Sequence, residues 1–441
     1  DGNISISGAT GTGGAFKIGD TVTATWNNTP GGDNNGDTIS SVTVDFSQFG
    51  GGAAVAAANA GGTWTAAFTI TSGALDAANR NILVTPTDNG GNATTTADTS
   101  NATVDSQPPA VTDAYIGISG ATGTDGAYKI GDTVTMSWNN TASGDNNSDT
   151  ISSVTADFSQ FGGGAAVAAA NAGGTWTSAY TITSGTVDAA NRNVSVTAID
   201  NAGNAATTAD TSNATVDSQA PAVTDANISI SGATGTGGAF KVGDTVTMNW
   251  DNTAAGDNND DISTVTADFS QFGGGAAVAA INTGDTWSAA YTITEDGGGS
   301  IDATNRNVSV TAIDNAGNST TTLDSTNATV DNDSPAVPST PDMADLSDTG
   351  SSSTDNITNN ASPTFGGTGD ANIDLTLHSS LDGAVGTATS GADGSWSVTP
   401  SLLTEGTHDI TATAADASGN TSTSPALVVV IDTTVPVLNG M

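Results

Sequence analysis

The stretch "KIGDTVTATW", from Lys17 to Trp26, decides the fold class of this chain. Its second half alternates strictly, with Val22, Ala24 and Trp26 on one side and threonines on the other. A β-strand points successive side chains to opposite faces, so this period of two predicts a strand with one buried face. The stretch "WTAAFTI", residues 64–70, alternates in the same way. We therefore expect sheets that bury one face, with the tryptophans in the core.

The segments between the predicted strands are rich in Gly, Asn and Asp and recur at intervals of about ten residues, which is typical of an antiparallel sandwich. Residues with high helix propensity are scarce. Only "GGGAAVAAAN", residues 50–59, is compatible with a helical turn, and an edge strand or a loop is the favoured interpretation. The predicted fold class is all-β.

The opening stretch occurs three times. "KIGDTVTMSW" begins at Lys129 and "KVGDTVTMNW" at Lys241, each 112 residues after the previous copy. A unit of this length is a whole domain, far longer than a solenoid repeat. We predict tandem antiparallel sandwiches with these bounds: repeat 1, residues 1–108; repeat 2, residues 109–220; repeat 3, residues 221–334.

The pattern changes after about residue 335. "DGSWSVTP" and "HDITATAADASGN" still alternate like strands, which predicts a fourth domain of a different subtype over residues 335–436. Its "DASGN" matches the "DNAGN" and "DNGGN" stretches of the repeats, and Asx-Gly segments of this kind suit tight hairpins. Residues 437–441 are expected to begin a further, truncated segment, so we interpret the chain as a window of a longer protein.

The charge is strongly acidic: 46 acidic residues against six basic ones give a net charge of −40. Nucleic acids and anionic membranes require a cationic face, so neither is an expected partner. All acids except Glu295 and Glu405 are aspartates, which favour turns and oxygen-rich cation sites. There is no cysteine, which excludes disulfides and thiolate metal sites. The longest apolar run, "ALVVVI" at 426–431, is too short to cross a bilayer.

Aspartates flank the proline joints between the repeats, "VDSQPPAVTDA" at 104–114 and "VDSQAPAVTDA" at 216–226. Proline fixes φ, so each joint is predicted to be short, extended and semi-rigid. The flanking carboxylates repel one another unless they share a cation, and Ca²⁺ accepts about six to eight oxygen ligands in irregular geometry. The alternative is solvated turn formers without a metal. The predicted joint ligands are Asp105, Asp113, Asp217, Asp225 and Asp331.

A second candidate calcium loop is "DNNGD" at 33–37, repeated as "DNNSD" and "DNNDD". Oxygen donors at positions one, three and five match the start of an EF-hand loop, but no Gly follows at position six and no Glu at position twelve. A solvated Asx-rich turn is the favoured alternative. The candidate ligands are Asp33, Asn35, Asp37, Asp145, Asn147, Asp149, Asp257, Asn259 and Asp261.

No constellation of residues predicts catalysis. His378 and His408 are the only histidines, and paired carboxylates are too abundant for any one pair to indicate a general acid and base. The stretch "FGGGAA" at 49–54 lacks the helix and lysine of a phosphate loop. We therefore expect no enzyme, no catalytic residues and no organic cofactor.

The last domain resembles a known family. "DLSDTGSSSTDNIT", "SPTFGGTG", "GTHDITATAADASGNTS" and "VVIDTTVP" resemble the bacterial Ig-like repeats of large, calcium-dependent, type I-secreted (RTX-type) surface adhesins. The first three units resemble other bacterial Ig-like repeats more loosely, through "VTVDFSQFGG" and "GTWTAAFTI". The resemblance implies a sandwich, an extracellular location at the bacterial cell surface, and calcium bound by Asp345, Asp348 and Asp355.

These observations predict a rod of tandem Ig-like domains that acts as a non-catalytic extender in cell adhesion and biofilm formation. It would project a binding domain from the cell, with Ca²⁺ rigidifying its joints. The expected partners are calcium ions and the neighbouring Ig-like domains of the same chain, without nucleic acid or membrane insertion. One alternative is a self-assembling structural subunit of a surface filament or S-layer. Another is a multivalent carbohydrate- or protein-binding module.

Overall fold

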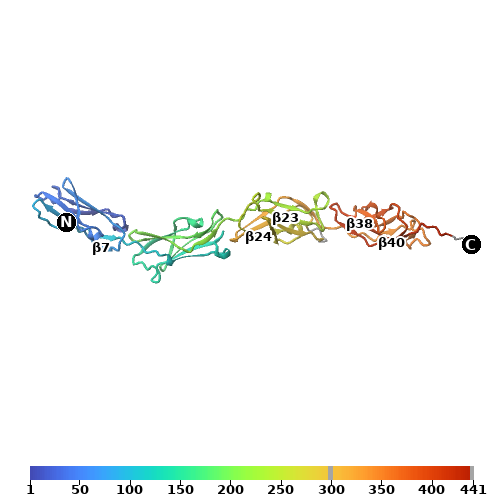
Figure 1. The fold of residues 1–441 in the computed structure, drawn as a ribbon, viewed down its shortest axis with the longest axis horizontal. Coiled ribbons are helices and arrows are strands. Elements are labelled where there is room, and N and C mark those ends of the chain that lie inside the picture. Colours follow the sequence, from blue (N-terminus) through green and yellow to red (C-terminus); the bar gives the residue numbers. More distant parts are fainter. Residues whose placement is uncertain (296–300, 438–441) are drawn as a thin grey trace. The chain divides into compact units, whose positions relative to one another are not determined.

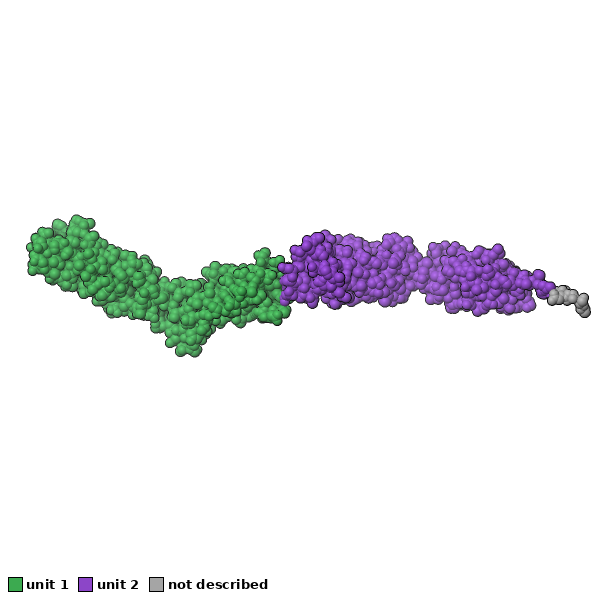
Figure 2. Space-filling view, viewed as in Figure 1, with its two compact units in different colours: residues 1–219, 316–318 green, residues 220–315, 319–441 purple. Residues whose placement is uncertain are grey.

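The computed structural model describes residues 1–295 and 301–437, and its ribbon consists of β-strands joined by loops and short 3₁₀ turns (Figure 1). The chain divides into two compact units, which are described separately: residues 1–219 with 316–318, and residues 220–315 with 319–441 (Figure 2). Among the described residues, no helix has the length and apolar character needed to cross a bilayer.

Repeat 1 is a sandwich of two four-stranded antiparallel sheets with the orders β1-β2-β6-β5 and β4-β3-β8-β9, plus the small pair β10-β7. Val22 and Trp26 from one sheet pack in one hydrophobic cluster with Val42 and Val44 from the other, which confirms the predicted alternation. The strands are β1 (Ile4–Ser7), β2 (Thr21–Asn27), β3 (Ile39–Asp45), β4 (Val55–Ala56), β5 (Ala58–Ala60), β6 (Thr63–Thr69), β7 (Asp76–Arg80), β8 (Leu83–Asp88), β9 (Thr96–Ala97) and β10 (Ala102–Asp105).

Repeat 2, also in the first unit, has the same two sheets, β11-β12-β16-β15 and β14-β13-β18-β19, with the pair β17-β20. Its core again contains two tryptophans, Trp138 and Trp176. The strands are β11 (Ile116–Ser119), β12 (Thr133–Asn139), β13 (Ile151–Asp157), β14 (Val167–Ala168), β15 (Ala170–Ala172), β16 (Thr175–Thr181), β17 (Asp188–Arg192), β18 (Ser195–Asp200), β19 (Ala205–Ala209) and β20 (Ala214–Asp217).

Repeat 3, in the second unit, follows the same plan with the sheets β21-β23-β27-β26, β25-β24-β29-β30 and β22-β31-β28. The strands are β21 (Ile228–Ser231), β22 (Phe240–Lys241), β23 (Thr245–Asp251), β24 (Ile262–Asp268), β25 (Val278–Ala279), β26 (Ile281–Thr283), β27 (Thr286–Thr292), β28 (Ala303–Arg306), β29 (Ser309–Asp314), β30 (Ser319–Leu323) and β31 (Ala328–Asp331).

The fourth domain is a sandwich with a different strand arrangement, in which β32-β34-β37 faces a larger sheet built around β38. Its core holds Phe365, Trp396 and Ile410. The strands are β32 (Asp342–Met343), β33 (Ile357–Thr358), β34 (Phe365–Thr368), β35 (Asp374–Ser379), β36 (Gly383–Thr389), β37 (Ser395–Val398), β38 (Gly406–Ala415), β39 (Thr421–Thr423) and β40 (Leu427–Ile431).

The glycine-rich stretch at 50–59 forms no α-helix. Gly50 has φ +86° and ends a 3₁₀ turn at Phe49, and a side chain at Gly51 would meet Phe46 and Phe68 atoms at 2.8 Å. The chain then forms β4 and β5, each at the edge of its sheet, as the favoured interpretation expected. The further segment expected from residue 437 lies, after Val437, outside the described residues.

Candidate functional site: an acidic cluster in unit 1

Two aspartates of repeat 1 face each other near its carboxyl end. In the β7–β10 ladder, Asp105 is the direct partner of Asp76. Asp105 is only 3% exposed, and its Oδ1 accepts a hydrogen bond from the Gln107 amide at 2.9 Å. Like charges placed directly opposite each other destabilise an antiparallel pair, so this arrangement carries a cost unless positive charge is nearby.

A hairpin of repeat 2 meets this end of repeat 1. Asp200 ends β18, and its Oδ1 accepts the amides of residues 202–204, which closes the tight "DNAGN" turn. The Asn204 side chain then reaches repeat 1: its Oδ1 accepts the Ile18 amide at 2.9 Å and its Nδ2 donates to the Asp105 carbonyl at 3.4 Å. The Thr12 amide donates to the Ala202 carbonyl at 3.2 Å. The hairpin therefore holds the two repeats together through backbone groups.

Asp149 completes the cluster. It lies in the loop before β13, and one carboxylate oxygen from each of Asp105, Asp149 and Asp200 lies within 4.8 Å of the others. Burial, a hydrogen bond shared with Asp76 and the surrounding negative charges raise the pKa of Asp149 to about 6. Burial is also the main cause that raises the pKa of Asp105. Among the described residues, no lysine or arginine nitrogen lies within 4.0 Å of these four carboxylates.

A divalent cation fits this donor set. Carboxylate and carbonyl oxygens are hard ligands that suit Ca²⁺, which tolerates irregular geometry better than Mg²⁺. The four acids come from two repeats, so a bound ion would link them: Asp76 and Asp105 from repeat 1, Asp149 and Asp200 from repeat 2. A cation would also offset the repulsion that raises the pKa of Asp149.

The structure brings Asp105 together with Asp149 and Asp200 rather than with Asp113. The Asp113 carboxylate instead accepts hydrogen bonds from the Thr211 amide and hydroxyl at 2.9 and 2.6 Å. Asp225 of unit 2 does the same for Ser325, at 2.8 and 2.6 Å. Each of these two aspartates therefore bonds a loop within its own repeat.

In the "DNNxD" loop of repeat 2, the first and third residues make hydrogen bonds within the repeat, whereas the fifth belongs to the acidic cluster. Asp145 accepts the Trp138 indole N–H at 2.6 Å, and Asn147 bonds the backbone of Ala110. Only the fifth residue, Asp149, joins the acidic cluster. In repeat 3, Asp257 and Asn259 make the corresponding contacts with Trp250 and Ala222. In repeat 1, Asp33 bonds Trp26 and Asn35 bonds Asn28, while Asp37 is exposed. The loop is therefore built unlike an EF-hand.

Three further predicted ligands, Asp217, Asp261 and Asp331, are not members of the cluster around Asp149. Asp217 ends β20 in unit 1 and accepts the Gln219 amide at 2.8 Å, whereas Asp261 precedes β24 in unit 2. Asp331 ends β31, and its carbonyl accepts the Asn420 side chain at 3.2 Å. This Asn420 contact repeats, within unit 2, the contact that Asn204 makes with Asp105.

In the fourth domain, Asp348 is 5% exposed and its Oδ2 accepts the Asn356 amide at 3.0 Å. Its Oδ1 is buried and has no hydrogen-bond partner among the described residues. Asp345 and Asp355 are exposed, and the three carboxylates do not form a group as close as that around Asp149. A buried carboxylate oxygen without a partner is costly, and an ion bound in this loop would satisfy it.

Sequence reasoning missed Asp76, Asp200 and Asn204 as site residues. The recurring Asp-x-x-Gly-Asn motif was interpreted as a hairpin only. The signal that could have found them is the asparagine of this motif, which recurs in all four domains. Its side chain bonds the aspartate of its own turn and can also reach a neighbouring repeat, as Asn204 does.

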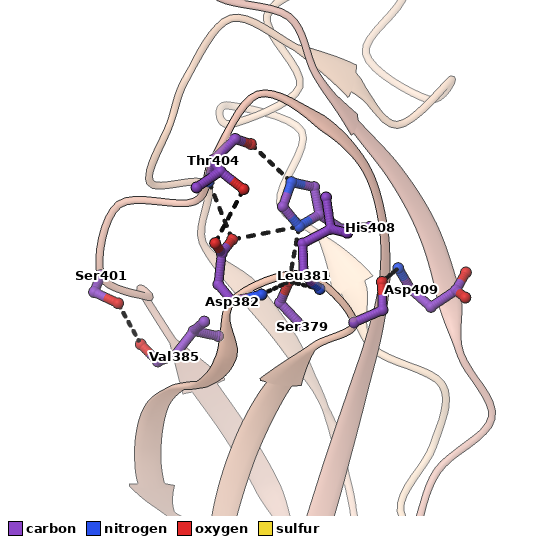
Figure 3. Close-up of polar contacts among 9 residues, drawn as sticks. Ser379, Leu381, Asp382, Val385, Ser401, Thr404, His408 and Asp409 are labelled. Atoms are coloured by element: carbon purple, nitrogen blue, oxygen red, sulfur yellow. Dashed lines mark hydrogen bonds and ion pairs between the residues drawn. The ribbon is translucent and has the colours of Figure 1, made fainter.

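His408 is buried in the fourth domain, at the contacts drawn in Figure 3. Its Nδ1 lies 2.7 Å from the Ser379 hydroxyl and 3.5 Å from an Asp382 oxygen, and its Nε2 lies 2.8 Å from the Thr404 carbonyl. In a catalytic triad the acid and the nucleophile sit on opposite ring nitrogens, whereas here both face Nδ1. The histidine joins the loop at Thr404 to the β35–β36 turn.

Fold and sites together define a chain of tandem Ig-like sandwiches. Residues 334–433 match the family model described as "Bacterial Ig-like domain". No curated protein sequence matches the chain.

Two similar solved structures span nearly the whole chain. One is a tetra-tandem repeat in the extending region of a large adhesion protein, which is 20% identical to this chain with a TM-score of 0.28. The match covers 98% of this chain and 99% of the other. The other is a Ca²⁺-stabilized adhesin of an Antarctic bacterium that binds ice, at 21% identity, the same coverages and TM-score 0.30.

Proposed function

We propose that this chain is an extender region of a bacterial surface adhesin, in which Ca²⁺ bound by acidic clusters stiffens the connections between Ig-like domains outside the cell. The observation that carries the proposal is the meeting of Asp76 and Asp105 from repeat 1 with Asp149 and Asp200 from repeat 2. The family match of residues 334–433 supports the bacterial Ig-like part of it.

A mechanical role follows from the position of the cluster. Without a cation, four neighbouring carboxylates repel one another across the contact between the repeats. The hydrogen bonds of the Asn204 side chain and the Thr12–Ala202 backbone bond oppose this repulsion. With Ca²⁺ bound, the same carboxylates attract a shared centre, which favours one orientation of repeat 1 against repeat 2. Each sandwich has its own apolar core, so the ion adjusts a connection and is not needed to form the sandwiches.

The loop around Asp348 supplies a second cation position in this proposal. There the ion would satisfy the buried Oδ1 of Asp348, with oxygens of the same loop as further ligands. Asp345 and Asp355 belong to that loop and are the acids that can move toward the ion.

Calorimetric titration of the full chain with Ca²⁺ tests the proposal. Asp149→Asn removes one charge from the cluster and should lower the number of bound ions by one. Asp125→Asn is the matched control, because Asp125 is exposed in a turn with φ +54°, a conformation that asparagine also accepts. Equal calcium binding by the wild type and Asp149→Asn, or no binding by either, would rule out the cluster as a calcium site.

A further inference from the structure

The last strand of repeat 1 pairs in parallel with a short segment near the start of the same repeat, through a bridge between Phe16 and Val104. The Phe16 amide donates to the Thr103 carbonyl, and the Asp105 amide donates to the Phe16 carbonyl, both at 2.8 Å. A regular parallel ladder would continue with the Ile18 amide donating to the Asp105 carbonyl. Each of these two groups instead bonds a residue of repeat 2.

The asparagine of the repeat 2 hairpin is inserted at this point of the ladder. Asn204 Oδ1 accepts the Ile18 amide at 2.9 Å, and Asn204 Nδ2 donates to the Asp105 carbonyl at 3.4 Å. The side-chain amide thus places an acceptor and a donor between the two strands, where they would otherwise bond each other. Asn204 is 3% exposed. A residue of repeat 2 therefore completes the parallel ladder of repeat 1.

The same insertion occurs within unit 2, where β22 and β31 of repeat 3 pair in parallel. Asn420 of the fourth domain accepts the Val242 amide at 2.8 Å and donates to the Asp331 carbonyl at 3.2 Å. It is 2% exposed. The fourth domain has a different strand arrangement from repeat 2, yet its hairpin makes the same pair of bonds. The feature common to both partners is the Asp-x-x-Gly-Asn hairpin.

The receiving repeat has a glycine where this hairpin approaches. Gly11 has φ −74°, which any residue accepts, but a Cβ there would lie 2.7 Å from the Ala202 carbonyl oxygen and 2.6 Å from that of Ala15. A Cβ at Gly235 of repeat 3 would lie 2.7 Å from the Ser418 carbonyl oxygen. Glycine at both positions leaves room for the hairpin backbone.

The completed ladder lies where tension between repeats 1 and 2 acts. The linker to repeat 2 leaves from the end of β10, so a pull on this linker slides β10 along residues 16–18. The hydrogen bonds of a parallel pair lie across that direction and share the load, whereas a hairpin peeled from one end loses its bonds one at a time. Two further bonds at the end of the ladder therefore slow its rupture.

We propose that the paired end strands of repeats 1 and 3 are a binding site for the Asp-x-x-Gly-Asn hairpin of the following domain, whose asparagine increases the resistance of the receiving repeat to tension. The partner is recognised by its hairpin and not by the rest of its domain. This inference extends the mechanical role proposed above, but it rests on the asparagine contacts and does not require calcium.

Unfolding of single full-length chains at constant force, in chelator, tests the proposal. Asn204→Ala should make the unfolding of one domain about tenfold faster, because the Ile18 amide and the Asp105 carbonyl lose a buried partner. Adding Asn420→Ala should accelerate the unfolding of a second domain. Asn92→Ala is the matched control and should change no rate, because Asn92 bonds the aspartate of its own turn in the same way but is exposed.

Hydrogen exchange separates this effect from damage to the hairpin. Asp200 accepts the backbone amides of residues 202–204, so the turn persists without the asparagine side chain, and the amides of β18 and β19 should stay protected in Asn204→Ala. Wild-type unfolding rates in Asn204→Ala and in the double variant, or equal acceleration by Asn92→Ala, would overturn the proposal. Neither outcome affects the calcium titration of Asp149→Asn, so the two proposals fail separately.

Discussion

Asp76 and Asp105 lie directly opposite each other in the β7–β10 ladder of repeat 1, and Asp149 of repeat 2 approaches both. A sheet gains nothing from two carboxylates in register. Such a pair is tolerated where another interaction compensates for it, and under the proposed function a cation shared with repeat 2 supplies that compensation.

Asp149→Asn should have opposite effects with and without calcium. In chelator it removes one of four crowded charges and should stabilise the first unit by up to about 1 kcal/mol, the scale of one like-charge contact at a partly exposed site. In millimolar Ca²⁺ it should destabilise the unit, because a ligand is lost. Thermal unfolding in chelator and in millimolar Ca²⁺ measures the sign of the stability change in each condition. A variant that lost stability in chelator as well would argue against charge repulsion in the cluster.

The pKa of Asp149 predicts the pH dependence of the calcium-free protein. Burial, the hydrogen bond to Asp76 and the nearby charges raise this pKa from 3.8 to about 6. The folded state therefore binds the proton more tightly than the unfolded state, so the stabilising contribution is fully present below pH 3.8 and is lost as pH rises toward about 6. Unfolding in chelator across this range should show the decline, and Asp149→Asn should flatten it.

Calcium binding should release protons near pH 6. Ca²⁺ requires the ionised carboxylate, so an ion that enters the cluster displaces the proton held by Asp149. Calorimetry in two buffers of different ionisation enthalpy counts the released protons. The number should fall toward zero above pH 8, and a number independent of pH would contradict the shared-proton geometry of Asp76 and Asp149.

Asn204→Ala should loosen the contact between repeats 1 and 2. It leaves the Ile18 amide and the Asp105 carbonyl without their partner, at a cost of about 1–3 kcal/mol. Exchange of the Ile18 amide should become faster. The Val242 amide, which bonds Asn420 in unit 2, is the internal control and should keep its protection. Unchanged exchange at Ile18 would show that the hairpin does not hold the contact in solution.

His408→Phe should destabilise the fourth domain by about 2–3 kcal/mol, because the Ser379 hydroxyl and the Thr404 carbonyl lose a buried partner. His378 is half-buried on the neighbouring strand, and His378→Phe should destabilise the domain by only about a few tenths of a kcal/mol. Denaturant unfolding of the two variants compares them. An equal cost would mean that the His408 contacts contribute no more than those of the half-buried His378.

Local pattern predicted the strands and cores well, because alternation such as Val22-Ala24-Trp26 directly reflects which face is buried. It also selected Asp105 and Asp149 as candidate ligands, from the joint and the loop respectively. It did not predict that they meet, because that depends on the Asp200–Asn204 hairpin packing on a neighbouring repeat. The alternation of apolar and polar residues within one repeat carries no information about a contact between two repeats. Asp113 was predicted to share a cation with Asp105 because the two are close in sequence. In the structure the Asp113 carboxylate accepts hydrogen bonds from Thr211 instead.

The most direct test of the calcium account is the spread of distances between repeats 1 and 2. The chain has no cysteine, so Ser47→Cys and Ser159→Cys give two spin labels at corresponding exposed positions. Pulsed electron paramagnetic resonance should give a narrow distribution of distances between the two labels in millimolar Ca²⁺ and a broader one in chelator. Adding Asp149→Asn and Asp200→Asn should keep it broad in both. Distributions of equal width with and without Ca²⁺ in the otherwise wild-type chain would contradict the claim that calcium stiffens this joint.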